Sequence, residues 1–117
     1  MTDYQDTLRR LAINDERFVQ SAVAGHPETA EPSQLEPNAR ALVRLGALLA
    51  IDAAPSSYQE CAEAALAAGA TLEDVVATLL AVAPIIGTAR LVSAAPELAL
   101  ALGYDVEAAL EEPDGDG

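Results

Sequence analysis

The chain contains one cysteine, Cys61, which is the candidate nucleophile of the sequence. Cysteine attacks as the thiolate, and the thiolate forms beside a cation, a base or a helix N-terminus. Helical spacing places Cys61 and Tyr58 on one apolar face, about a turn inside a helix, with flanking carboxylates that would raise the pKa of the thiol. Two interpretations stay open: a buried, inert cysteine, or a reactive or ligand-contacting thiol with Tyr58 beside it.

Glu60 and Glu63 fall on the opposite side of the same predicted helix. They could act as acid/base groups if a partner subunit covered them, and otherwise they form a solvated face. Arg90 is the one basic residue after position 53, and we expect it to form an ion pair at a helix or subunit contact. The candidate catalytic residues are therefore Cys61, Tyr58 and Glu60, and the candidate substrate-binding residue is Arg90.

The remaining basic groups give weaker indications. Arg40 and Arg44 lie one turn apart and could bind a carboxylate substrate, but in so acidic a chain we expect them to pair with Glu or Asp. His26, the one histidine, precedes a proline and has no acid or cysteine at ligand spacing, so we expect a surface histidine. The sequence predicts no metal site and no cofactor.

Helices must position these side chains, because Ala and Leu dominate the apolar residues and β-branched residues are scarce. The expected helices cover 4–11, 15–23, 38–51, 56–68, 72–86, 88–102 and 105–110. This pattern predicts an all-α bundle of about six helices around a central antiparallel helical hairpin, 56–86. We expect a single domain, 1–117, with N-terminal helices in 1–24, a Pro-rich linker at 25–37, a core at 38–110 and an acidic tail at 111–117.

Several residues are expected to begin or end these helices. Ser56 or Ser57 is expected to cap the helix that carries the cysteine, because each has Gln or Glu three residues later. Thr71 with Asp74 forms the same pattern before the next helix, and Asn14 or Asp15 and then Asp105 are expected to cap others. Pro84 and Gly87 should split the apolar stretch into two helices, and Pro96 should disturb the second.

Composition excludes several functional classes. The 117 residues carry 19 acidic and 6 basic side chains, for a net charge of -13, which repels nucleic acid and anionic membrane surfaces. The longest uncharged run, 75–89, is shorter than the roughly 20 residues that span a bilayer, so we expect no membrane insertion. The start of the chain does not look like a leader peptide, and the single cysteine cannot form an intramolecular disulfide. We therefore expect a cytoplasmic protein.

One part of the sequence looks familiar. The run Tyr58-Gln-Glu-Cys-Ala-Glu-Ala-Ala-Leu-Ala-Ala-Gly-Ala-Thr-Leu-Glu-Asp-Val-Val is followed by Leu79-Leu-Ala-Val-Ala-Pro-Ile-Ile-Gly-Thr-Ala-Arg. Together they resemble the carboxymuconolactone decarboxylase family, which includes the alkyl hydroperoxidase D-like proteins, over about residues 37–104. The resemblance implies an all-helical fold built around a helical hairpin, assembled as a dimer, trimer or hexamer.

The same resemblance argues against the family's dithiol hydroperoxidase chemistry. The positions of its Cys-x-x-Cys pair hold Ala54 and Ser57 here, its histidine position holds Cys61, and 38–51 lacks its relay glutamate. The resemblance therefore implies a divergent member with a small-molecule pocket near Cys61. One alternative is an enzyme that uses Cys61, either a single-cysteine hydroperoxide reductase with peroxiredoxin activity or a lactone or acid decarboxylase. A second alternative is a non-catalytic oligomeric binding or scaffold protein.

Two segments are apolar on nearly every side, 38–51 and 75–89, within the predicted helical regions 38–51 and 72–102. A lone bundle of small side chains has too little interior to bury so much apolar surface. The surplus predicts a homo-oligomer whose subunits pack through these helices, with the acidic groups on the outer rim.

Overall fold

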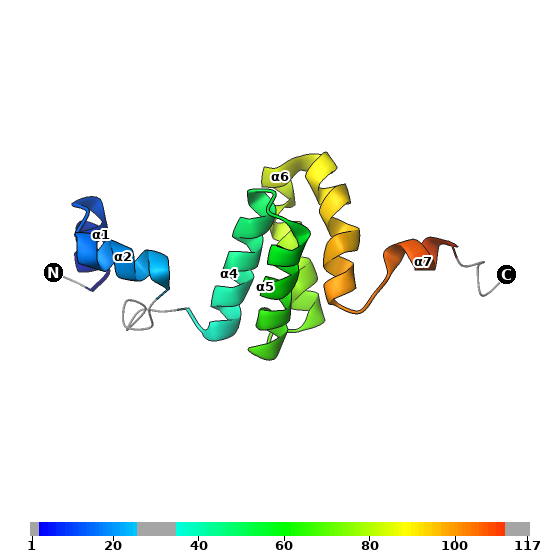
Figure 1. Cartoon of the computed structure of the whole chain (residues 1–117), viewed down its shortest axis with the longest axis horizontal. Coiled ribbons are helices and arrows are strands. Elements are labelled where there is room, and N and C mark those ends of the chain that lie inside the picture. The colour runs from blue at the N-terminus through cyan, green and yellow to red at the C-terminus, as the bar shows by residue number, and fades with distance from the viewer. Residues whose placement is uncertain (1–2, 26–34, 112–117) are drawn as a thin grey trace. The chain divides into compact units, whose positions relative to one another are not determined.

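The computed structural model describes residues 3–25 and 35–111 (Figure 1). All regular structure within these ranges is helical, so the predicted all-α class is confirmed. The helices are α1 (Asp3–Ala12), α2 (Glu16–Ala24), α4 (Pro37–Ala50), α5 (Pro55–Ala67), α6 (Leu72–Ala101) and α7 (Val106–Glu111). The chain divides into two compact units, Met1–Leu35 and Glu36–Gly117. His26, most of the predicted linker and most of the predicted acidic tail lie outside the described residues.

The first unit is a pair of short helices. Asn14 adopts a positive φ of 57° in the turn between them, and the Asp15 side chain accepts a hydrogen bond from the Phe18 backbone N–H at 3.4 Å. Asp15 therefore caps α2 and is one of the two residues predicted to do so. The guanidinium of Arg10 lies 5.5 Å from the centre of the Phe18 ring, which joins the two helices by a cation–π contact.

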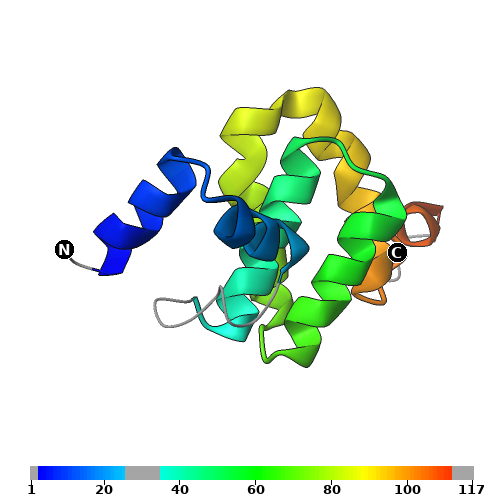
Figure 2. The ribbon, with the colours of Figure 1, turned by 60° about the vertical axis from the view of Figure 1, so that its left-hand side comes forward.

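In the second unit α4, α5 and α6 all contact one another. Consecutive helical segments run in opposite directions, because α6 reverses near its middle and returns along the body (Figures 1 and 2). The reversal occurs at Gly87, whose φ of 81° and ψ of 171° are accessible to glycine and almost to no other residue. We call residues 72–86 the first arm of α6 and residues 88–101 the second arm.

The split of the long apolar stretch was predicted, but the effect of its second proline was not. Pro96 lies within the second arm, and Gly87 is the one non-helical position inside α6. A proline removes one backbone donor and still fits a helix when its own φ is helical. The second arm therefore continues through Pro96, and the break in α6 lies at Gly87.

By length and composition α6 could cross a membrane, since its most apolar window has a mean hydropathy of 2.0. The bend at Gly87 divides that apolar stretch into the two arms. Each arm is about 21–23 Å long, less than the roughly 30 Å of a hydrocarbon core. In this fold the two arms therefore form a reversed pair and not one straight span.

Two helix starts test the predicted caps. Thr71 and Asp74 form the expected capping box, with two reciprocal hydrogen bonds of 3.0 Å. The cap expected from Ser56 or Ser57 is wrong, because α5 begins at Pro55 after Ala54 and has no side-chain cap. Proline suits the first position of a helix, since its fixed φ is already helical and it has no N–H to satisfy.

The core lies where α4, α5 and both arms of α6 meet. Its buried side chains are Leu45, Leu49, Tyr58, Ala62, Val75, Leu79 and Leu98. Alanine on α5 lets the neighbouring helices approach closely, so a chain with few large side chains still forms a packed interior.

Two side-chain hydrogen bonds attach the second arm to the rest of the unit. The Gln59 amide donates to the Glu97 carbonyl at 2.7 Å, and the Arg90 guanidinium donates to the Ala50 carbonyl, also at 2.7 Å. The second bond satisfies a carbonyl in the last turn of α4, where a cation is favoured by the helix dipole.

Candidate functional site

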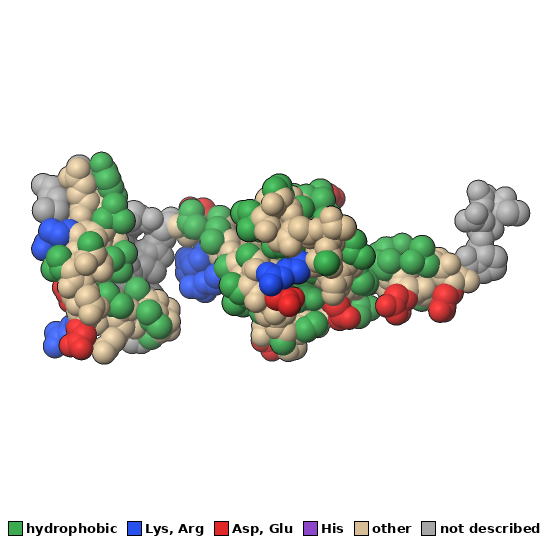
Figure 3. Space-filling model, turned by 90° about the horizontal axis from the view of Figure 1, so that it is seen from above, with side chains coloured by type: hydrophobic (Ala, Val, Ile, Leu, Met, Phe, Trp, Pro, Cys, Tyr) green, Lys and Arg blue, Asp and Glu red, His purple; other side chains and the backbone are tan. Residues whose placement is uncertain are grey.

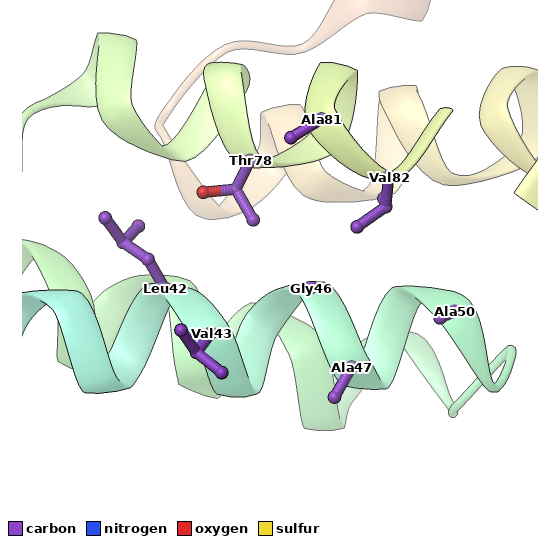
Figure 4. Close-up of a pocket in the computed structure, with 8 residues that line it drawn as sticks. All are labelled: Leu42, Val43, Gly46, Ala47, Ala50, Thr78, Ala81 and Val82. Atoms are coloured by element: carbon purple, nitrogen blue, oxygen red, sulfur yellow. The ribbon is translucent and has the colours of Figure 1, made fainter. Parts of the chain in front are cut away.

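A groove lies between α4 and the first arm of α6 in the second unit (Figure 4). It encloses about 420 Å³, within the usual range of ligand sites, and it is open along its length. The lining residues are Leu42, Val43, Gly46, Ala47, Ala50, Thr78, Ala81 and Val82.

The α4 wall of the groove contains a glycine, Gly46. A Cβ atom at Gly46 would lie 3.3 Å from Val82 Cγ1 and 3.5 Å from Thr78 Cγ2. The missing side chain thus allows α4 and α6 to approach each other at this level. Gly46 is buried, and its neighbours Leu45 and Leu49 face the core.

The walls of the groove carry no ionisable side chain. Their one polar side chain is Thr78, whose hydroxyl donates to the Asp74 carbonyl at 2.9 Å within its own helix. General acid–base or nucleophilic catalysis requires groups that these walls lack. The groove is therefore suited to apolar contact.

Large apolar side chains beside the groove are exposed. Val43 in the α4 wall is 60% exposed, and Ile85, one turn beyond Ala81 on the first arm, is 77% exposed. Figure 3 shows apolar side chains spread over the surface of the helical body, with acidic groups in separate places. Contiguous exposed apolar surface of this kind is typical of a contact site.

The structure places the predicted site residues elsewhere. Tyr58 is 5% exposed in the core, and Cys61 is half-buried and packs against the same core. Glu60 is exposed, on the solvent side of α5 as expected. Arg90 binds the end of α4 through a backbone carbonyl rather than through a carboxylate. None of these four residues lines the groove.

Burial controls the chemistry of the two partly enclosed groups on α5. Desolvation raises the pKa of the Cys61 thiol, and the Glu60 charge raises it further, while the Arg44 charge lowers it. The balance is a raised pKa, so the thiol is protonated at neutral pH. Burial also raises the pKa of the Tyr58 hydroxyl, with smaller contributions from Glu97 and Asp52.

Within the described ranges no three His, Cys, Asp or Glu side chains gather closely enough to hold a metal ion. The carboxylates of the second unit are instead distributed along its solvent faces. The groove walls hold no charged side chains that could pair with a charged cofactor.

Sequence reasoning did not find the groove, although two signals point to it. Gly46 stands inside a strongly helical segment, where glycine costs about 1 kcal/mol relative to alanine and so marks a close approach of backbones. The uncharged run 75–89 supplies the opposite wall. Neither signal places a reactive group there.

No protein-family model, curated protein or solved structure matches this chain.

Proposed function

We propose that this protein is a non-catalytic, homo-oligomeric helical protein whose subunits contact one another through the groove between α4 and the first arm of α6. It would be a divergent protein of the carboxymuconolactone decarboxylase type that serves as a scaffold or binding protein. The observation that carries the proposal is the uncharged groove, with exposed Val43 in its α4 wall and exposed Ile85 one turn beyond Ala81 on the first arm.

Burial of these side chains in a subunit contact would be strongly favourable. Each Val, Leu or Ile side chain contributes roughly 1.5–3 kcal/mol when it passes from water to an apolar environment. The exposed side chains of Val43 and Ile85 therefore favour a covered state over a free monomer.

Charge supports the same surface. Neither 37–51 nor 75–89 contains an acidic residue, although the net charge of the chain is -13.

 Like-charge repulsion between two copies is therefore weakest where these two segments face outward. Arg40 and Arg44 on α4 can meet acidic groups of another subunit at the edge of such a contact.

The state of the thiol supports the non-catalytic part of the proposal. A protonated, half-buried Cys61 lacks the thiolate character that peroxide reduction requires. The positions of a dithiol relay hold Ala54 and Ser57, so a second thiol to resolve an oxidised cysteine is absent from the sequence. The order α5, Gly69, a capped α6 and the Gly87 break supports the resemblance to the family.

Assembly is tested by light scattering on the full chain at micromolar concentration. We expect the wild type to be an oligomer and Ala47→Glu, in the groove wall, to dissociate it. Ala64→Glu is the matched control, since it makes the same change at an exposed position of α5. The control should keep the oligomer, and both variants should remain helical by circular dichroism. A monomeric wild type, or equal dissociation of both variants, would refute the groove contact.

A hydroperoxide reductase that uses Cys61 is the second candidate, and one observation favours it. The Arg44 charge acts to lower the pKa of the thiol, as a cation does at a reactive cysteine. Peroxide consumption with an added thiol reductant separates the two candidates. The non-catalytic proposal expects equal rates for wild type and Cys61→Ser, whereas a rate that disappears with the thiol would establish the enzyme.

A further inference from the structure

The bend in α6 depends on a single residue. Inside this helix only Gly87 has backbone angles outside the helical region, with a φ of 81° and a ψ of 171°. A change of these two angles to helical values would join the arms into one continuous helix of 30 residues, about 45 Å long. Hinges in proteins have this character, since a few residues absorb a large change in φ and ψ.

The second arm fills a specific place in the core of the second unit. Leu98 is 2% exposed there, and the half-buried Leu91, Ala94, Ala95 and Ala101 pack against the same cluster. These contacts join the arm to side chains that precede the bend. The second arm of another copy carries the same groups, so it would fit the same place.

The polar contacts of the arm are equally transferable. The Gln59 amide of α5 donates to the Glu97 carbonyl of the arm, and the Arg90 guanidinium of the arm donates to the Ala50 carbonyl of α4. Each bond joins the arm to a helix on the other side of the bend. Both bonds therefore form equally well when the arm belongs to a second copy.

A straight α6 would also offer a contact that the bent helix lacks. Ile85 and Val92 are 77% and 65% exposed, on separate arms. They are seven positions apart, so on a continuous helix they would share one face, together with the exposed Thr88 and Ala89. Two straight helices that cross near Gly87 would bury these uncharged side chains against each other.

We propose that α6 is a hinge through which two copies of this chain exchange their second arms. Gly87 straightens in both copies, each second arm takes the place of the other in the core, and an intertwined dimer results. Exchange reproduces the contacts of the closed chain, which makes it a low-cost route to a dimer. A short hinge in an unusual conformation favours such exchange. The proposal goes beyond the groove contact and does not depend on it.

Crosslinking between two differently marked full-length chains tests the exchange. One chain carries Gln59→Cys and the other Glu97→Cys, both with Cys61→Ser, and a short bismaleimide joins cysteines that lie close together. A chain with both new cysteines should be crosslinked within itself at low concentration, because the two residues are in contact. After incubation at high micromolar concentration, we expect the mixed chains to be crosslinked to each other, and increasingly so as the concentration rises.

Two glycine variants make the test specific to the hinge. Gly87→Ala in both chains disfavours the bend and favours a continuous helix, so it should increase the mixed crosslink several-fold. Gly103→Ala is the matched control, because it adds the same methyl group at a glycine with a φ of 82° just beyond the second arm. Open space surrounds an added Cβ at both positions. The control should leave the mixed crosslink at the level of the unchanged chain.

The outcomes separate arm exchange from the groove contact. Absence of the mixed crosslink from chains with the natural Gly87, or an equal increase in Gly87→Ala and Gly103→Ala, would overturn the exchange. The first of these outcomes decides even if Gly87→Ala does not fold. Ala47→Glu should keep the mixed crosslink, whereas its loss in that variant would assign the crosslink to the groove and overturn the exchange. The response of the oligomer to Ala47→Glu reports on the groove alone, so the two proposals fail separately.

Discussion

The two sides of α4 differ in exposure far more than in composition. Leu45 is fully buried in the core, while Val43, two residues earlier, is 60% exposed beside the groove. The first arm of α6 repeats the contrast, since Leu79 is buried and Ile85 is 77% exposed. Both sides are apolar, and the side that is covered is the one against which α5 and the second arm pack.

This comparison separates two uses of the same residue types. On the core side, Leu and Val stabilise the folded chain by packing with other helices. On the groove side, equally apolar residues add little to the stability of a single chain, because they stay in water. Their contribution is expected in a contact with another molecule.

The largest expected effect is a leucine truncation on the core side. Leu45→Ala should lower the free energy of unfolding by about 2–5 kcal/mol, because it leaves a cavity in a packed interior. Ile85→Ala truncates an exposed apolar side chain on the groove side and should alter single-chain stability by less than about 0.5 kcal/mol. Denaturant unfolding at low protein concentration measures both values. Similar losses in the two variants would remove the distinction between the two sides.

The next effect concerns the bend that brings the second arm onto the core side. Gly87→Ala should destabilise the chain by about 1–3 kcal/mol, because its φ and ψ lie in a region that is essentially restricted to glycine. The measurement is again denaturant unfolding, with helix content followed by circular dichroism. A variant as stable as the wild type would show that the bend does not require this conformation.

A smaller effect is expected at the start of α6. Thr71→Ala removes the capping box and should cost about 1 kcal/mol. Ser57→Ala is the control, because α5 begins at Pro55 without a side-chain cap, and its thermal unfolding should match that of the wild type. A larger loss from Ser57→Ala than from Thr71→Ala would reverse the assignment of caps.

The smallest effect is a pH dependence that comes from the core side. The pKa values of Tyr58 and Cys61 are raised in the folded chain. The unfolded chain therefore loses these protons at a lower pH than the folded chain does. Their stabilisation is complete below the ordinary pKa of each group and is lost as the pH rises through the raised value. Stability should therefore fall from neutral to alkaline pH, and Tyr58→Phe should reduce the fall. An equal fall in Tyr58→Phe and in the wild type would show that Tyr58 does not contribute to it.

Much of the fold follows from local patterns in the sequence. Periodicity and turn residues predicted the helices of both units, and the Thr71 cap and the break before Thr88 were found because their signals are local. The prediction of a Ser56 or Ser57 cap was wrong because Pro55 occupies the first position of α5, so both serines lie inside the helix.

The site was harder to predict, because it depends on which helices lie side by side. Cys61 and Tyr58 attract notice by residue type, yet they serve the packing of α5 against the core. The groove is built from alanine, valine and one glycine, which carry no chemical signature. Its position follows from the parallel course of α4 and the first arm of α6, which only the fold reveals (Figure 4).

The hydrogen bonds from Gln59 and Arg90 have a consequence for how the molecule opens. Each joins the second arm to a helix about forty positions earlier in the chain, one to α5 and one to α4. Fraying of this arm from its N-terminal side must break the Arg90 bond, and fraying from its C-terminal side must expose Leu98 and break the Gln59 bond. Amide hydrogens of the second arm should therefore exchange with solvent together, as one cooperative unit, rather than residue by residue from its end.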